Sequence, residues 1–246
     1  MKENIDIPPN AVRVWRGYRS NSLQVSDFLS KLGAVFIPAG VEMQIAAGLA
    51  AYVPSILAGL PNKPASVPDE TAVLFWESQQ TYSDGFRMLA VRIYTLTHGP
   101  IYQPPSTAQF PVAFAGSLKS ELPVYLIDQP ADWMHGKVTH LVGGRPASVS
   151  LADFQTKIAG VLSDIQRQGN VAGAVACAGD DYLVYWELAG EEESNSVAAL
   201  QTCLDWSQIL TPVTTQLTAG LWDDWPGITI GAGSSLNIQF VRRWDG

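Results

Sequence analysis

The feature that most constrains the fold of this chain is an internal repeat. The stretch RGYRSNSLQVSDFLSKLGAVF, which begins at Arg16, aligns without a gap to VGGRPASVSLADFQTKIAGVL, which begins at Val142. The alignment places Phe154 on Phe28. Because a repeated sequence folds into a repeated structural unit, the chain is predicted to contain two copies of one supersecondary pattern.

A second match follows in the same order. The segments AVLFWES and YLVYWEL place Trp76 on Trp186 and Glu77 on Glu187. Alternation along a strand directs the glutamates to the face opposite the tryptophans. A second sheet against that face would bury them, so we expect these glutamates to pair with arginines or to form a polar seam. The first copy is longer between its matches, and the proline-rich residues 60–68 are predicted to be a loop.

Each copy has the residue pattern of two helices and four strands. Residues 12–18 and 138–144 are rich in residues that favour strands and end in glycine-containing turns, which predicts a first strand in each copy. A helix follows, and in the second copy its apolar period of three and four residues ends near Gly169. Two strands joined by a turn and a second helix come next. The final strands are expected at residues 124–127 and 237–244.

The order βαββαβ, read twice, predicts an α+β fold of two tandem ferredoxin-like halves, residues 1–134 and residues 135–246. A single half would leave one apolar face of its sheet bare. Packing two sheets face to face buries that surface, so the halves are expected to close into an intramolecular pseudo-dimeric barrel.

Charge and hydropathy exclude several classes of function. The formal net charge is −8, and no cluster of lysine and arginine interrupts it, which argues against a nucleic acid partner. The most apolar stretch, residues 33–60, contains Pro38, Glu42 and Pro54, so it is interpreted as protein core and no membrane partner is expected. The N-terminal residues lack the apolar segment of a secretory signal, so a cytoplasmic location is expected.

The histidines and cysteines make no metal-binding pattern. The three histidines include no HxxxH spacing, and Cys177 and Cys203 form no CxxC pair. We therefore expect no metal and no cofactor, and we interpret the cysteines as core thiols. His135 is interpreted as part of a solvated linker, whereas His140 lies in a predicted strand and could face either layer.

The segment WESQQTY, from Trp76 to Tyr82, resembles a motif of the dimeric α+β barrel superfamily, in which a strand ends in W-x-S and an aromatic residue follows. The element order is similar as well. That superfamily includes cofactor-free antibiotic-biosynthesis monooxygenases, and haem enzymes such as chlorite dismutases and aldoxime dehydratases. The resemblance implies a ligand pocket between each sheet and its helices, and it carries over no single catalytic residue. The second half keeps only Trp186 and Glu187 of the motif.

The N-terminal half holds the candidates for such a site, because it keeps the fuller motif. His98, at the end of the second helix, is the candidate base, and Tyr82 is the second candidate catalytic residue. Trp76, Arg92 and Tyr102 are the candidate substrate-binding residues. Structural alternatives exist for two of them: the helix dipole favours a histidine at the position of His98, and Trp76 could simply pack on a helix.

We therefore expect a small-molecule enzyme that acts on an apolar or aromatic substrate. Its reaction would be that of a cofactor-independent monooxygenase, or of an isomerase or cyclase of secondary metabolism. A non-catalytic small-molecule binding protein is the first alternative. A haem enzyme of the chlorite dismutase or aldoxime dehydratase type is the second, although haem enzymes of the superfamily place the axial ligand in the C-terminal half, where no histidine follows His140. Whether the fused pair forms a further homodimer is left open.

Overall fold

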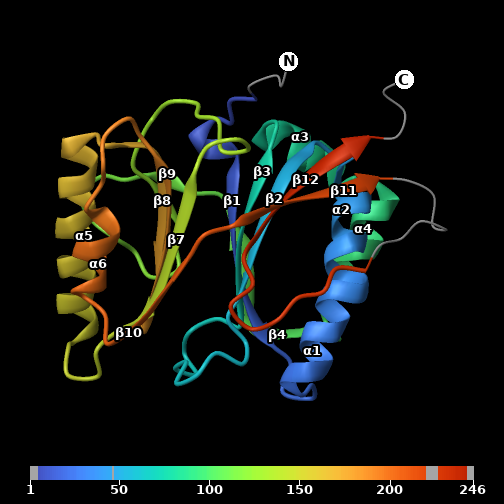
Figure 1. Ribbon diagram of the computed structural model, residues 1–246, viewed down its shortest axis with the longest axis horizontal. Coiled ribbons are helices and arrows are strands. Elements are labelled where there is room, and N and C mark those ends of the chain that lie inside the picture. The colour runs from blue at the N-terminus through green and yellow to red at the C-terminus, as the bar shows by residue number, and fades with distance from the viewer. Residues whose placement is uncertain (1–4, 46, 220–226, 243–246) are drawn as a thin grey trace. The chain divides into compact units, whose positions relative to one another are not determined.

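The computed structural model describes residues 5–45, 47–219 and 227–242 (Figure 1). Within these residues the strands form two six-stranded sheets. The chain divides into two compact units, which we name after one strand of each. The β3 unit comprises Trp15–Pro61, Pro68–Ala108 and Pro212–Gly246, and the β9 unit comprises Met1–Val14, Asn62–Val67 and Gln109–Thr211.

The sheet of the β3 unit has the strand order β11-β12-β2-β3-β1-β4. Its strands are β1 (Val12–Arg19), β2 (Leu49–Ile56), β3 (Glu70–Trp76), β4 (Tyr102–Gln109), β11 (Val213–Ala219) and β12 (Leu236–Arg242). Its helices are α1 (Val25–Lys31), a π-helical turn (Leu32–Phe36), α2 (Ile37–Ile45), α3 (Gln79–Gly85) and α4 (Leu89–Leu96). Helices α1, α2 and α4 lie along one face of this sheet (Figure 1).

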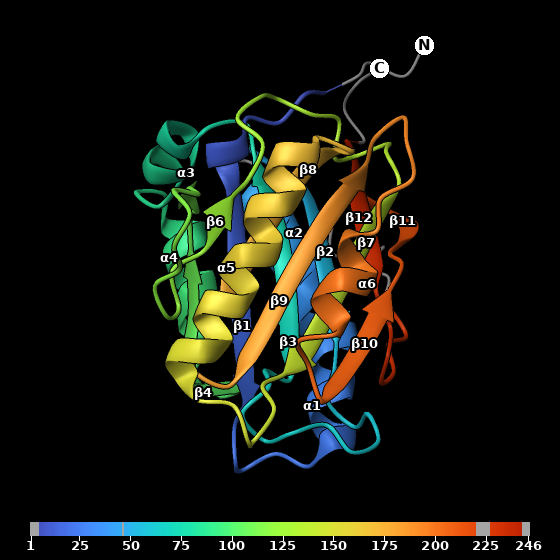
Figure 2. The ribbon, with the colours of Figure 1, turned by 90° about the vertical axis from the view of Figure 1, so that its left-hand side faces the viewer.

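The sheet of the β9 unit has the strand order β10-β7-β9-β8-β6-β5. Its strands are β5 (Val112–Ala113), β6 (Val124–Tyr125), β7 (Val138–Gly144), β8 (Val171–Ala178), β9 (Tyr182–Ala189) and β10 (Trp206–Leu210). A short 3-10 turn (Pro9–Ala11) precedes β1, and the helices are α5 (Leu151–Gln168) and α6 (Ser196–Gln201). Both helices lie on one face of this sheet (Figure 2).

The repeat in the sequence recurs in the backbone. Strands β1 and β7 begin at aligned valines, and Arg19 and Arg145 each donate a guanidinium hydrogen bond to the carbonyl four residues later. Strands β2 and β8 have eight residues each, and the pairing of each with the next strand shifts register near its first residue. The two halves therefore share their first three strands in detail.

The two matched tryptophans lie on corresponding strands but not at corresponding positions. Leu49 and Val171 are counterparts, because each is the first residue of its strand and lies just before the register shift. Leu49 pairs with Trp76, whereas Val171 pairs with Ala189. Trp186 lies three residues before Ala189, and an odd offset reverses the face to which a strand residue points. The pairing of Trp76 with Trp186 is therefore wrong in register.

The final strands differ from the expected ones. The strand expected at residues 124–127 is β6 and pairs with β8, while β12 covers part of the strand expected at 237–244 and pairs with β2. Each of them joins the sheet built from the other repeat. Residues 243 and 244 of the expected strand lie outside the described residues. The compact units therefore do not follow the expected division at residue 134, because these strands are exchanged.

The position beside each first strand is filled by β4 and β10 instead. The sequence of β4, YQPPSTAQ, is polar and contains two prolines, which is typical of an edge strand and gives no apolar alternation to recognise. When the four strands β1 to β4 and the four strands β7 to β10 are each numbered along the chain, both sets have the sheet order fourth, first, third, second. These orders are β4-β1-β3-β2 in the β3 unit and β10-β7-β9-β8 in the β9 unit.

Helix α5 begins and ends where the apolar period predicts. The Ser150 hydroxyl accepts the N–H of Asp153 at 3.1 Å, and Gly169 ends the helix in a left-handed conformation with φ of 67°. The residues predicted to pack this helix and α1 on their sheets are fully buried: Phe28, Leu32, Phe154 and Ile158.

The run Val25–Ile45 is long and apolar enough, by length and composition, to cross a membrane. Within the protein, 62% of that window is buried. This burial is the environment of a core helix, in agreement with the interpretation of the apolar stretch as core. Cys177 and Cys203 are buried free thiols, as predicted.

Candidate functional site

A buried carboxylate lies at the first residue of β3. Glu70 has no exposed surface, and it accepts hydrogen bonds from Tyr52 Oη at 2.6 Å, from Trp15 Nε1 at 3.0 Å and from the Tyr102 hydroxyl. These donors come from β2, β1 and β4, which belong to the same sheet. Because an ionised carboxylate can only accept hydrogen bonds, three donors around Glu70 suit its charged form.

Aromatic rings from the helices pack over this carboxylate. The Tyr102 ring meets Phe28 of α1 and Phe36 of the π-helical turn edge to face, with centroids 5.7 and 5.3 Å apart. The ring of His98, just beyond α4, lies 5.5 Å from Trp15 and 4.8 Å from Phe36. The group therefore lies between the sheet and the helices of the β3 unit. We call it the Glu70 cluster: Trp15, Phe28, Phe36, Tyr52, Glu70, Tyr94, His98 and Tyr102.

Burial sets the protonation chemistry of the cluster. Loss of water raises the pKa of Glu70, while the hydrogen bonds from Tyr102, Tyr52 and Trp15 lower it and offset only part of the rise. Burial, with the Glu70 charge nearby, also raises the pKa of Tyr52, Tyr94 and Tyr102 well above its usual value. The phenols therefore stay neutral donors, and the pKa of Glu70 moves toward neutral pH.

Two glycines leave room for these rings. A Cβ at Gly17 would lie 2.7 Å from both Trp15 Nε1 and Tyr102 Cε1. A Cβ at Gly40 would lie 2.5 Å from Tyr94 Oη. Since real Cβ atoms do not come so close, any larger residue at either position would displace a ring of the cluster.

Two of the five predicted site residues meet in this cluster. The rings of His98 and Tyr102 lie 6.0 Å apart. His98 is half-buried, and its Nδ1 lies 3.1 Å from the carbonyl oxygen of Thr95. Tyr102 is 5% exposed and bonds Glu70 directly. His98 is thus the more accessible of the two. Tyr102 contacts the ring of His98 and also hydrogen bonds the Glu70 carboxylate.

Trp76 and Tyr82 contact each other at the other end of β3. Their ring centroids are 4.8 Å apart, and Tyr82 lies 4.5 Å from Phe86. Trp76 shares a strand face with Glu70 six residues away, roughly 20 Å along the strand. Its Nε1 is buried, and no described residue accepts its hydrogen. Arg92, the fifth predicted residue, is an exposed residue of α4.

The β9 unit also buries a carboxylate, but with fewer donors. Glu187 is 8% exposed and accepts hydrogen bonds from Tyr185 Oη at 2.9 Å and from the Ser196 hydroxyl. Its partners are therefore hydroxyl groups and not the expected arginine. Glu77 is exposed, so the expected burial is wrong for this residue, because it lies just past the end of β3.

His140 is a core residue of the β9 unit. Its ring stacks on Trp186 with centroids 4.1 Å apart, and its Nδ1 lies 2.9 Å from the carbonyl oxygen of Tyr185. Burial lowers the pKa of His140 to about 4, although the backbone hydrogen bond raises it in part. His140 is therefore neutral at pH 7.

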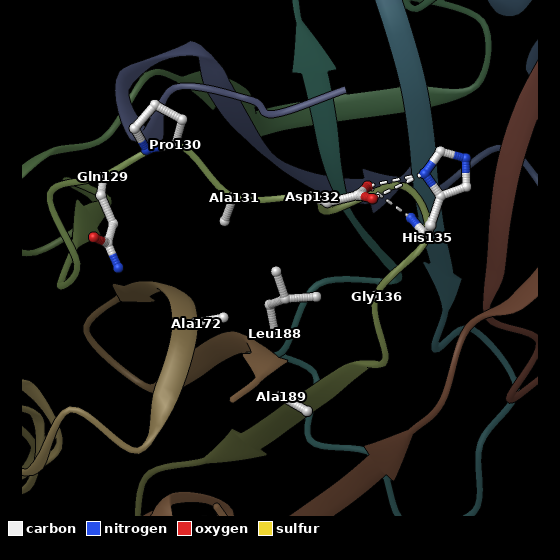
Figure 3. A pocket seen from close by; sticks show the side chains of 9 residues that line it. All are labelled: Gln129, Pro130, Ala131, Asp132, His135, Gly136, Ala172, Leu188 and Ala189. Carbon is white, nitrogen blue, oxygen red and sulfur yellow. Dashed lines mark hydrogen bonds and ion pairs between the residues drawn. The ribbon is translucent and has the colours of Figure 1, made fainter. Parts of the chain in front are cut away.

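A hollow of about 380 Å³ opens on the β9 unit beside an Asp–His pair (Figure 3). His135 Nδ1 lies 3.0 Å from Asp132 Oδ2, and Asp132 Oδ1 also accepts the N–H of Met134 and of His135. In Figure 3 both side chains lie at one margin of the hollow, and the outer nitrogen of the imidazole points away from the other lining residues. Asp132 and His135 therefore stabilise the loop in which both lie. The interpretation of His135 as part of a solvated linker did not include this contact.

Glu70, Trp15 and Tyr52 belong to no motif in the sequence and were not among the predicted site residues. Glu70 is followed by Thr71 and the apolar run AVLFW, and a carboxylate at the first position of a buried strand was the available signal. Its donors come from three other strands, so only the tertiary fold shows that they converge.

Comparison with known proteins finds structural neighbours only. No family model and no curated protein matches the chain. Among solved structures, a proposed monooxygenase from Fusobacterium nucleatum is similar to 81% of this chain over 89% of its own, at 7% identity and a TM-score of 0.36. One from Lactobacillus acidophilus is similar to 81% of this chain over 91% of its own, again at 7% identity and a TM-score of 0.36.

An anthrone oxidase-like protein is similar to 84% of the chain over 92% of its own, at 7% identity and a TM-score of 0.34. All three likenesses are weak, with TM-scores between 0.34 and 0.36. At such identity they assign no role to any residue of this chain.

Proposed function

We propose that the β3 unit is the site of an enzyme that removes a proton from a small, apolar or aromatic molecule, with Glu70 as the base. The observation that carries this proposal is a fully buried carboxylate that accepts hydrogen bonds from Tyr52, Trp15 and Tyr102. A buried charge is costly to a fold, so its retention in an otherwise aromatic environment supports a functional role.

The pKa of Glu70 supports the role of base. A general base works best when its pKa is close to the working pH, and burial raises the pKa of Glu70 in that direction. The ionised form accepts the proton, so turnover should rise as the pH rises through the pKa of Glu70. The neutral phenols and the indole around Glu70 hold this carboxylate in place.

Tyr102 is placed to connect Glu70 with a substrate. Its hydroxyl donates to Glu70, while its ring contacts Phe28, Phe36 and His98. The substrate proton passes to the Tyr102 oxygen as the tyrosine's own proton passes to Glu70, which leaves the substrate as an anion and Glu70 neutral. A cofactor-independent monooxygenase offers such an anion to O2, and an isomerase or cyclase rearranges it.

His98 was predicted from the sequence as the base, and in this proposal it becomes a substrate contact, because Glu70 takes the role of base. His98 stands at the accessible side of the cluster, where it can hydrogen bond a polar group of the substrate. Trp76 has a buried Nε1 without an acceptor among the described residues. It lies roughly 20 Å along β3 from Glu70, so a small substrate of the Glu70 cluster does not reach this donor. Tyr82 lies against Trp76, and Arg92 is free to meet a substrate only from the outer surface of α4.

The same proposal includes the architecture. The βαββαβ order with the strand order fourth, first, third, second in each unit supports two tandem ferredoxin-like halves that form an intramolecular pseudo-dimeric barrel. The exchanged strands β6 and β12 support it further, since each half completes the sheet of the other.

The binding-protein alternative uses the same cluster without turnover. The haem alternative would need an open nitrogen on His98, but four aromatic rings lie within 6.0 Å of this imidazole. This packing favours a contact role for His98 over an axial ligand.

The test is a thermal-shift screen of phenols, naphthols and anthrones, followed by product analysis in the presence and absence of oxygen. We expect a stabilising compound to be converted, and Glu70→Gln to lose about 100-fold or more in turnover with its fold intact. His98→Gln should weaken binding, and Glu187→Gln serves as the matched control. Binding with no conversion would establish the carrier alternative, and full turnover by Glu70→Gln would remove Glu70 as the base.

A further inference from the structure

Strand β11 differs from the other strands that end the two sheets. An edge strand exposes unpaired N–H and C=O groups, and proteins usually blunt such an edge with prolines, charges, register shifts or short length. In the described residues, β4 contains Pro104 and Pro105, β5 has two residues, and β10 has five. Each of these three edges is poorly suited to pairing with a further strand.

None of those devices is present in β11. The strand has seven residues, VTTQLTA, with no proline and no charged side chain. It pairs in parallel with β12 in continuous register from Val213 to Ala219. Val213, Thr214 and Gln216 are exposed, and Figure 2 draws β11 at the margin of the sheet beside β12. Threonine and valine also favour an extended backbone.

The distribution of charge favours a second copy of this chain as the partner of β11. The chain carries a net charge of −8, so two copies repel each other across most of their surfaces. The residues from Leu210 to Gly220 include no charged side chain. Two copies can therefore approach along β11 without placing like charges opposite each other, which a strand edge with acidic residues would not allow.

We propose that β11 is an interaction surface for a second copy of this chain. Two β11 strands pair antiparallel about a two-fold axis near Gln216, the middle residue of the strand, and join two six-stranded sheets into one. Such a contact is self-complementary, because each strand supplies the same backbone donors and acceptors to the other.

The test is a charge exchange at Gln216. The unaltered protein is expected to dimerise, while Gln216→Lys and Gln216→Glu each place like charges across the axis. Each change should weaken dimerisation roughly fivefold, which corresponds to about 1 kcal/mol. An equimolar mixture of the two variants should restore dimers that contain one copy of each, as measured by native mass spectrometry and sedimentation.

The matched control makes the same charge changes at Thr156, an exposed residue of α5 in the other unit. Thr156→Lys and Thr156→Glu should leave dimerisation unchanged. A monomeric unaltered protein would overturn the proposal. So would variants at Gln216 that dimerise as well as those at Thr156, or a mixture that forms no mixed dimers.

Discussion

The two units share their strand order, but they fill the space between sheet and helices differently. By the shared register of the hairpins, Glu70 corresponds to Leu183, because each is the residue paired with the last residue of its eight-residue partner strand. Tyr52 corresponds to Ala174 in the same register. One core therefore carries a polar group where the other carries an aliphatic side chain.

The gapless repeat extends this comparison to the first strand and helix. Trp15 aligns with Leu141, whereas Phe28 aligns with Phe154. Leu141 and Phe154 belong to the apolar core of the β9 unit, together with Ala174 and Leu183. The aromatic anchor is kept in both units, while the groups that hold and position a carboxylate are present in one. The β9 unit thus has the same strand order with an apolar core at these positions, so this strand arrangement can form without a cluster like that of Glu70.

The largest expected effect concerns the anchor that both units keep. Phe28 and Phe154 are fully buried, so replacing either with alanine should lower the free energy of unfolding by about 3 to 5 kcal/mol. Denaturant unfolding of Phe28→Ala and Phe154→Ala measures both values. A loss below about 1 kcal/mol in either variant would break the structural equivalence of the two helices.

The next effect is a loss of stability at low pH that arises from His140, a residue of the β9 unit. His140 has a pKa of about 4 in the folded protein, below its unfolded value, so the folded state binds fewer protons. The stabilisation is complete above about pH 6.5 and is lost as the pH falls toward 4, by about 3 kcal/mol in total. The aligned residue of β1 is the buried Val14, which cannot titrate.

Unfolding at pH 7 and pH 4.5 of the unaltered protein and of His140→Val measures this term. The variant should lose less stability between the two pH values. Equal losses would show that His140 does not contribute to the acid sensitivity.

A smaller effect is expected when the β3 unit is given the residue of the β9 unit. Glu70→Leu leaves the hydroxyls of Tyr52 and Tyr102 without their acceptor, and it should cost about 2 kcal/mol of stability. Adding Tyr52→Phe and Tyr102→Phe should recover part of that loss, since it removes two of the three stranded donors and leaves only Trp15 Nε1. If the triple variant is no more stable than Glu70→Leu, the hydroxyls are not held by Glu70.

The smallest effect is expected at His98. The residue is half-buried and follows α4, so His98→Gln should change the free energy of unfolding by about 1 kcal/mol or less. Thermal unfolding measures the change. A loss of several kcal/mol would give His98 a structural role and remove it as a candidate substrate contact.

Periodicity predicted the parts of the fold that depend on neighbours in the chain. Helix α5 and the hairpin of β8 and β9 follow directly from local pattern and from the caps Ser150 and Gly169. The exchange of β6 and β12 could not be predicted, because which edge a strand joins is decided by tertiary pairing.

The candidate site also has a part that the sequence predicted and a part that it did not. His98 and Tyr102 lie four residues apart in the chain and were found together, whereas Glu70 and Trp15 are 55 residues apart and meet only in the folded sheet. A buried carboxylate has no sequence pattern of its own. Its donors must be seen before its role can be inferred.

The most direct test of the account is binding of a small aromatic probe, 2-naphthol, to variants of the two buried carboxylates. Calorimetric titration compares the unaltered protein with Glu70→Gln, Tyr102→Phe and Glu187→Gln. We expect the first two changes to weaken binding at least about tenfold, or about 1.4 kcal/mol, while Glu187→Gln binds as the unaltered protein does. Binding that is lost in Glu187→Gln and retained in Glu70→Gln would place the site in the β9 unit and contradict the account.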